Sequence, residues 1–230
     1  MKEPDSSVAI LLTVGAGRNA QAMPQAEPQA EPQAEPPPDF VRLADIAPHI
    51  KQDMRYAGSE NFLGRPVPGY RAAQCWLRRE AAAALAAVAK EAAAAGLSLV
   101  VYDGYRPQRA TRAFIAWAAD PSDQAMKPAY YPNLDKADLF DLGYIARESA
   151  HSTGTAVDLA LEGLDFGTPF DLFDAASGTH DPGISQAAKQ NRAILIALMG
   201  RHGFVNFDKE WWHFTLEGLD NVRPLDFEVR

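Results

Sequence analysis

The chain reads Leu97-Ser98-Leu99-Val100-Val101-Tyr102-Asp103-Gly104-Tyr105-Arg106-Pro107 near its middle. The first half of this stretch is an apolar, β-branched run, which predicts a strand over 97–102. The second half turns the chain, and Pro107 suits the first turn of a helix. An alanine-rich helix is expected just before it, over 76–95, with Gly96 as the residue that ends it. The stretch therefore predicts the strand of a helix–strand–helix unit.

The segments on either side extend this unit into an α+β domain. Asp120-Pro121 ends the helix that begins at Pro107, and residues 121–148 show no clean period, so we expect a long loop that covers a site. The later elements are expected to be a strand over 156–160, a helix over 185–199 and a hairpin of 204–207 with 211–216. This order predicts helices packed on a small, mainly antiparallel sheet.

Composition limits the classes of function. The chain has 230 residues, of which 47% are apolar and 23% charged, as in ordinary globular domains. A formal net charge of −8 and the lack of a basic stripe exclude a nucleic-acid-binding protein. No apolar run reaches the roughly 18 residues of a transmembrane helix. Cys75 is the single cysteine, so an internal disulfide and a cysteine-rich metal site are excluded, and we expect Cys75 to be buried.

Residues 1–38 differ from the rest of the chain. An apolar segment over 8–16 and the small residues Ala20-Gln21-Ala22 predict a signal peptide over 1–22 and a periplasmic or otherwise exported protein. The alternative is a cytoplasmic protein with a disordered tail or a misassigned start, because Lys2-Glu3-Pro4-Asp5 is acidic where a signal should be basic. Residues 23–38 repeat Pro-Gln-Ala-Glu, which predicts a semi-rigid spacer before a single domain over 39–230.

Two short motifs supply the parts of a metal site. The chain reads Ser149-Ala150-His151 shortly before Asp158, and Glu210-Trp211-Trp212-His213 near its C-terminus. Two imidazoles and a carboxylate match the three protein ligands of a catalytic zinc ion. Asp158 lies on an apolar strand between small neighbours, where a carboxylate needs a partner. Taken singly, His213 could be a hydrogen-bonded core histidine and Asp158 could pair with an arginine. Their joint occurrence indicates a zinc site.

Glu210 and Arg106 extend this interpretation to catalysis. Glu210 precedes the expected strand 211–216, on which Trp211 and His213 should share one face, and its spare carboxylate suits a general base acting on water. Arg106 ends a buried strand and is fixed by the following proline. A preorganised guanidinium can stabilise an oxyanion. The alternative is that Arg106 pairs with Asp103 or Asp171 as part of the scaffold.

These motifs resemble those of the D-alanyl-D-alanine dipeptidases, zinc enzymes of vancomycin resistance and bacterial cell-wall turnover. The resemblance rests on Ser-x-His-x6-Asp, Asp-Gly-Tyr-Arg-Pro and Glu-Trp-Trp-His, at 149–158, 103–107 and 210–213. It covers nearly all of 39–230 and includes three further stretches: Asn61-Phe62-x-Gly64, Tyr130-Tyr131-Pro132-Asn133 and Gly167-Thr168-Pro169-Phe170-Asp171.

The resemblance implies hydrolysis of free D-Ala-D-Ala, a small dipeptide, to two D-alanines at a site holding one zinc ion. The implied zinc ligands are His151, Asp158 and His213. Glu210 is implied as general base and acid, and Arg106 as the transition-state stabiliser. The implied substrate contacts are Ser149 for the carboxylate end and Asp171, helped by Tyr56, for the ammonium. In the family the long aromatic loop keeps the pocket small.

Two other functions stay open at this point. One is a D,D-carboxypeptidase or endopeptidase that trims peptidoglycan stems, which would share the two-histidine, one-aspartate site but need an open groove. Asp171 and the intact segment 121–148 favour the dipeptidase. The other is a non-catalytic zinc domain that binds cell-wall peptides. The presence of Glu210 weighs against it, because a binding site has no need of a base.

Overall fold

A computed structural model describes residues 35–230. The predicted signal peptide 1–22 and all but the last residues of the predicted spacer 23–38 lie outside the described residues. The helices and strands are, in chain order, β1 (Phe40–Arg42), α1 (Leu43–Ile46), β2 (Lys51–Gln52), β3 (Trp76–Arg78), α2 (Arg79–Ala94), β4 (Leu99–Asp103), α3 (Gln108–Ala119), α4 (Lys127–Tyr130), β5 (Ala156–Leu161), α5 (Gln186–Gly200), β6 (Phe204–Asn206) and β7 (His213–Leu216).

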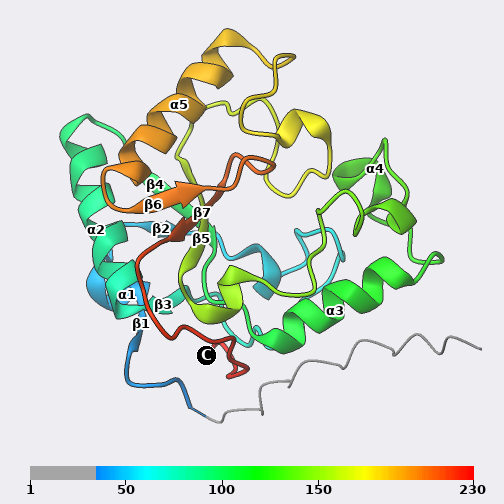
Figure 1. Ribbon diagram of the computed structural model, residues 1–230, viewed down its shortest axis with the longest axis horizontal. Helices are drawn as coiled ribbons and strands as arrows, with labels where there is room; N and C mark the ends of the chain where they lie inside the picture. Colours follow the sequence, from blue (N-terminus) through cyan, green and yellow to red (C-terminus); the bar gives the residue numbers. More distant parts are fainter. Residues whose placement is uncertain (1–34) are drawn as a thin grey trace, which may run out of the picture.

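A five-stranded sheet in the order β2-β4-β5-β7-β6 forms the centre of the fold. Its strands run antiparallel except at the edge, where β2 pairs parallel with β4. A second, two-stranded sheet pairs β1 with β3. Helices α2 and α5 pack together on one side of the strands, and α3 and α4 lie on the other (Figure 1). The prediction of an α+β domain with a mainly antiparallel sheet is therefore confirmed.

Three element starts were predicted wrongly, and the first is the strand expected from Leu97, which begins at Leu99. The alanine-rich helix begins at Arg79 and not at Trp76, because 76–78 form β3 and pair with β1. The last strand begins at His213 and not at Trp211, because the chain turns before it: Glu210 N–H donates to Phe207 O, and His213 N–H donates to Glu210 O. Trp211 and Trp212 are both buried, and their rings meet edge-on with centroids 5.3 Å apart, so they do not point to opposite faces as in a regular strand.

The segment 121–148 also carries more structure than a plain loop. It contains α4 and a turn of 3-10 helix at Lys136–Asp138. Ser185 caps α5 by accepting the Ala188 N–H. Gly96 follows the end of α2 with a left-handed φ of +73°, which confirms the prediction that it ends this helix. In the part of the chain that the structure describes, helices with the length and apolar character of a membrane span are absent.

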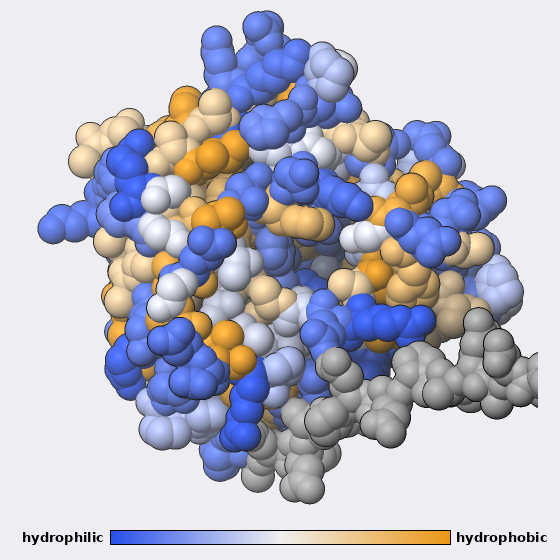
Figure 2. Space-filling view, in the orientation of Figure 1, coloured by the Kyte–Doolittle hydropathy of each residue, from blue (hydrophilic) through white to orange (hydrophobic). Residues whose placement is uncertain are grey.

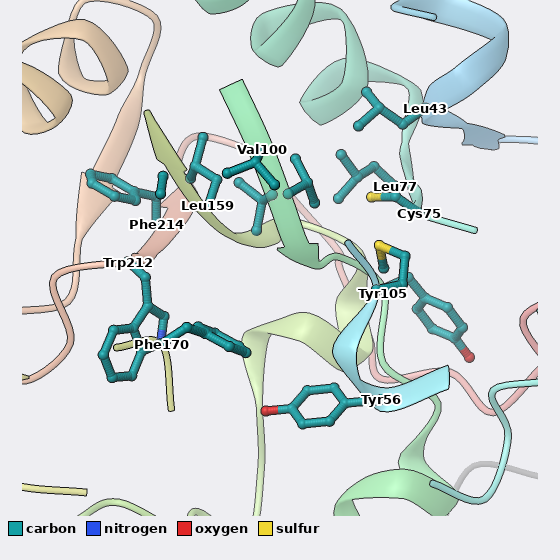
Figure 3. Packing of buried hydrophobic residues seen from close by; sticks show 14 of the residues in the cluster. Leu43, Tyr56, Cys75, Leu77, Val100, Tyr105, Leu159, Phe170, Trp212 and Phe214 are labelled. Carbon is teal, nitrogen blue, oxygen red and sulfur yellow. The ribbon is translucent and has the colours of Figure 1, made fainter. Parts of the chain in front are cut away.

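The core joins the three central strands to the turn that follows β4. Figure 3 shows Val100, Leu159 and Phe214, which come from β4, β5 and β7, within one cluster of buried side chains. Below them Trp212 meets Phe170 edge-on, with ring centroids 5.4 Å apart. Cys75 is fully buried, as expected.

Gly104 makes close packing possible where β4 ends. A Cβ atom at this position would lie 2.5 Å from the Cys75 Sγ and 2.9 Å from the Trp76 carbonyl oxygen. A larger residue would push the turn away from β3, so the glycine keeps residues 103–107 close to the core.

Candidate functional site

Three neighbouring strands place polar side chains at matching positions. Asp103 at the end of β4 pairs with Asp158 of β5, and Asp158 pairs with His213 of β7. The register between β4 and β5 shifts just before Asp103, in the manner of a β-bulge. Such irregularities re-aim side chains beside active sites. This polar row across the sheet is the frame of the site.

His151, Asp158 and His213 meet at one point. The His151 Nε2 lies 3.2 Å from Asp158 Oδ1 and 3.0 Å from His213 Nδ1, and the His213 Nδ1 lies 3.0 Å from Asp158 Oδ1. Ligand atoms at about 2.0–2.2 Å from a tetrahedral zinc ion stand about 3.3–3.6 Å apart. The observed triangle is slightly tighter than this, so its two nitrogens and one oxygen fit a small divalent metal such as zinc.

The backbone and side chains around the cluster orient its rings. The His151 Nδ1 lies 2.7 Å from the Gly104 carbonyl oxygen, which can only accept, so Nδ1 carries the proton and the Nε2 lone pair faces the cluster. The His213 Nε2 lies 3.3 Å from Thr215 Oγ1. Hydrogen bonds from the outer ring nitrogens are what metal-binding histidines usually make. His151 comes from the short 3-10 turn before β5, and Gly154 ends this turn with its positive φ of 77°.

The charges of this cluster support one another. Burial opposes ionisation of Asp158, but the two imidazoles outweigh it and hold the pKa of Asp158 below its usual range. Burial likewise opposes a charged His213, but the hydrogen bond and charge of Asp158 raise the pKa of His213 above its usual value. The cluster is thus an anionic carboxylate between two imidazoles, one of which holds a proton more tightly than usual.

Glu210 lies beside the cluster without being part of the triangle. Its Oε2 is 3.9 Å from His213 Nδ1, and 17% of its side chain is exposed. Burial raises the pKa of Glu210 to about 7, against the opposing charge of His213. A carboxylate with this pKa can accept and return a proton near neutral pH.

Arg106 pairs with Asp103 and also faces the cluster. Its Nε and Nη2 lie 3.0 and 2.9 Å from Asp103 Oδ2, and its Nη2 lies 3.7 Å from Asp158 Oδ2. The guanidinium carbon sits over the rings of Tyr56 and Phe114, at 5.2 and 5.0 Å from their centroids. The scaffold contact expected of Arg106 therefore exists with Asp103, and this contact turns the rest of the guanidinium toward the site.

Asp171 and Tyr56 form a second polar pair. The Tyr56 hydroxyl lies 3.1 and 2.9 Å from the two carboxylate oxygens of Asp171, to which it donates. Burial and then the negative charge of Asp158 raise the pKa of Asp171 well above its ordinary value. Asp171 also has a φ of +63°, which is uncommon for a residue with a Cβ. Ser149 caps the turn that carries His151, and its Oγ accepts the His151 N–H at 3.3 Å.

One cavity of about 190 Å³ is lined by all eight side chains that the sequence nominated. The face of the molecule between the β6–β7 hairpin and the segment that carries α4 is hollowed and largely hydrophilic (Figure 2). Residues 143–146 line the cavity, so the predicted covering segment 121–148 does contribute to its wall. None of the eight predicted site residues lines a second, larger cavity of about 350 Å³. This cavity is lined by Tyr102, Trp211 and part of residues 160–170.

Sequence reasoning missed several residues of the site. Phe207 and Thr111 line the cavity, and nothing in their local sequence marks them. Arg192 on α5 does not line the cavity, but it is buried and donates to backbone carbonyls on both sides of the segment that carries Asp171. A signal for Arg192 did exist, because it lies four residues after Ala188 and three before Leu195 on the buried face of the helix. An arginine in such a stripe indicates a specific polar contact in the interior.

Comparison with known proteins adds to this geometry. Residues 37–227 match the sequence model of a peptidase family, M15, described as D-Ala-D-Ala dipeptidase. The chain is similar to a D-alanyl-D-alanine dipeptidase of Enterococcus faecium, with 39% identity over 83% of this chain and 98% of that protein. It is also similar to proteins of the same name from two other organisms. The protein of Enterococcus faecalis is 39% identical over 80% of this chain and 94% of that protein. The protein of Streptomyces coelicolor is 37% identical over 78% of this chain and 92% of that protein.

Proposed function

Because the chain belongs to the D-alanyl-D-alanine dipeptidase family, we propose that it hydrolyses free D-Ala-D-Ala to two molecules of D-alanine. One observation carries this proposal: a single small cavity joins a three-ligand metal cluster, a carboxylate with a pKa near neutrality and a buried acidic residue. Its volume of about 190 Å³ lies below the roughly 300–1,000 Å³ of sites for drug-sized ligands, which suits a substrate as small as a dipeptide.

His151, Asp158 and His213 would hold one zinc ion per chain in this proposal. Their donor set, their spacing and the hydrogen-bonded outer nitrogens of both rings fit a catalytic zinc site. When bound, zinc supplies Lewis-acid chemistry, polarising a carbonyl and lowering the pKa of water toward about 7.

The protein's own residues move the proton and stabilise charge. Glu210 takes a proton from the attacking water and returns it to the leaving amine, which its pKa of about 7 allows. Arg106 stabilises the oxyanion that forms at the scissile carbonyl. Its bond to Asp103 holds the guanidinium in place before the substrate arrives, so no reorientation is needed during the reaction.

Recognition of both ends of the dipeptide completes the proposal. Ser149 contacts the carboxylate end, and Asp171 with Tyr56 binds the ammonium. Asp171 supports this assignment because no ion pair between residues 35–230 includes it, although it is buried. A substrate ammonium would supply the missing cation and favour the ionised carboxylate.

One assay distinguishes this function from the two alternatives. Zinc-loaded protein is incubated with D-Ala-D-Ala and, separately, with a stem pentapeptide ending in D-Ala-D-Ala, and free D-alanine is measured. We expect release from the dipeptide and little from the pentapeptide. Comparable release from the pentapeptide would establish a D,D-carboxypeptidase, and bound zinc with no release from either would establish a binding domain.

We also infer that the protein is exported and acts in the periplasm or outside the cell. The support is the apolar segment 8–16, the small residues Ala20-Gln21-Ala22 and the proline-rich repeat that follows them. Mass spectrometry of the protein from its native host should find a mature N-terminus near Met23. An intact Met1 in a cytosolic fraction would contradict export.

A further inference from the structure

All three guanidinium nitrogens of Arg192 on α5 donate hydrogen bonds to backbone carbonyl oxygens. Only 1% of the residue is exposed. Its Nε donates to Phe166 O at 2.8 Å, its Nη2 to Ala176 O at 2.9 Å and its Nη1 to Gly178 O at 2.6 Å. None of the ion pairs found among residues 35–230 includes Arg192, and the negative charges of Asp181 and Asp165 act on it only from beyond contact distance. Three convergent carbonyls therefore account for the burial of the cation.

These carbonyls lie on both sides of the segment that carries Asp171. Phe166 precedes residues 167–175, and Ala176 and Gly178 follow them. Asp171 lies within the segment with its φ of +63°. A left-handed backbone is strained at a non-glycine residue and persists only where the surrounding structure holds it. The two anchored ends supply that restraint.

A further hydrogen bond carries the restraint from the anchored end to the neighbour of Asp171. Ser177 lies between Ala176 and Gly178, whose carbonyl oxygens accept from Arg192. The Ser177 Oγ donates to Leu172 O at 2.7 Å. Leu172 directly follows Asp171. A continuous series of hydrogen bonds thus connects the Arg192 guanidinium to the backbone next to Asp171.

We propose that Arg192 is a positioning residue that fixes Asp171 in the orientation needed to bind the substrate ammonium; this rests on the proposed dipeptidase function. Lysine cannot replace it, because an ammonium is a compact point charge that lacks the rigid planar fork matching three fixed acceptors. Residue 192 would therefore determine specificity for a free amino terminus without touching the substrate.

The test compares Arg192→Lys with wild type and with Arg109→Lys as a matched control. Arg109 also uses several guanidinium nitrogens, but on Asp226 and Glu228 near the C-terminus, none of which lines the cavity. We expect Arg192→Lys to raise KM for D-Ala-D-Ala about tenfold to a hundredfold, with kcat within about threefold of wild type. Its preference for D-Ala-D-Ala over N-acetyl-D-Ala-D-Ala should shrink by the same factor. Arg109→Lys should keep both values.

Hydrogen exchange of residues 167–175 supplies a readout that does not depend on activity. Faster exchange there in Arg192→Lys, but not in Arg109→Lys, supports the proposal. Unchanged exchange, or an unchanged KM and preference in folded Arg192→Lys, would overturn it. If wild type fails to cleave D-Ala-D-Ala, the proposed function fails and the exchange measurement alone decides whether Arg192 positions the segment. Arg192→Gln replaces the lysine variant if the latter does not fold, and the same outcomes apply.

Discussion

Replacing Asp171 with asparagine should remove the preference for a free amino terminus. The carboxylate is 5% exposed, accepts hydrogen bonds from Tyr56 and has no ion-pair partner among residues 35–230. The Tyr56 hydroxyl can still donate to the oxygen of the asparagine amide, so the variant loses the charge and keeps the shape. The substrate ammonium then loses its buried counter-ion.

The size of this loss follows from the burial of the pair. Removing one member of a buried, hydrogen-bonded charge pair costs about 2–5 kcal/mol. At 1.4 kcal/mol per factor of ten, this is roughly a 30-fold to several-thousand-fold loss in kcat/KM for D-Ala-D-Ala. N-acetyl-D-Ala-D-Ala has no ammonium, so wild type should cleave it poorly and Asp171→Asn should change its rate much less.

The assay measures kcat/KM for both dipeptides in wild type, Asp171→Asn and the control Asp174→Asn. Asp174 lies in the same segment and caps the 3-10 turn Ala175–Ser177 by accepting the Ala176 N–H. Asparagine caps equally well, and the exposed Asn133 amide, which donates to the other oxygen of Asp174, can turn over to accept from the new amide, so this control should behave like wild type. Comparable kcat/KM for free and acetylated dipeptide in wild type would refute the reasoning and favour a carboxypeptidase.

Four further outcomes test the metal and its neighbours. His151→Ala and His213→Ala should each lose most of the roughly one zinc per chain expected of a three-ligand site by metal analysis, and full occupancy in both would disprove the ligand assignment. Glu210→Gln should retain zinc and lose turnover by roughly 10²-fold or more, whereas wild-type turnover would remove Glu210 from the mechanism. Arg106→Lys should also lower kcat, because an ammonium lacks the planar group of donors with which arginine can bind Asp103 and face the oxyanion at the same time. A nearly unchanged kcat would mean that Arg106 only supports the structure. Zinc affinity should rise with pH through the raised pKa of His213, since zinc binds the neutral imidazole and must displace its proton, and a pH-independent affinity would contradict this.

The sequence predicted the helices and strands that are determined by residues close together in the chain. The β-branched run of β4 and the proline just before α3 each act within a few residues, and the structure confirms the strand and the helix that they predicted. The start of α2 was wrong because alanine-rich sequence favours helix, whereas 76–78 pair with β1, more than thirty residues earlier. Distant pairing of this kind leaves no mark in the local pattern.

The same distinction holds in the site. Seven of the eight predicted site residues belong to short motifs and Tyr56 does not, but the fold brings all eight to one cavity. A turn replaces the strand that was expected from Trp211. Glu210 still lies beside His213, because the turn bond from His213 N–H to Glu210 O holds the two residues together. Arg192 could not be assigned a partner from sequence, because the atoms it binds are backbone carbonyls, which every residue possesses.

The row of Asp103, Asp158 and His213 across three paired strands determines where the chain can change its length. Inserting or deleting one residue within β4, β5 or β7 would turn the affected side chain to the opposite face of the sheet and bury its polar group in the core. Insertions in the connection 121–148, or in 162–184 away from the anchored segment 167–175, would leave the row intact and reshape only the cavity wall. Descendants of this protein can therefore acquire new substrates through loops of altered length, while their strands keep a constant residue count.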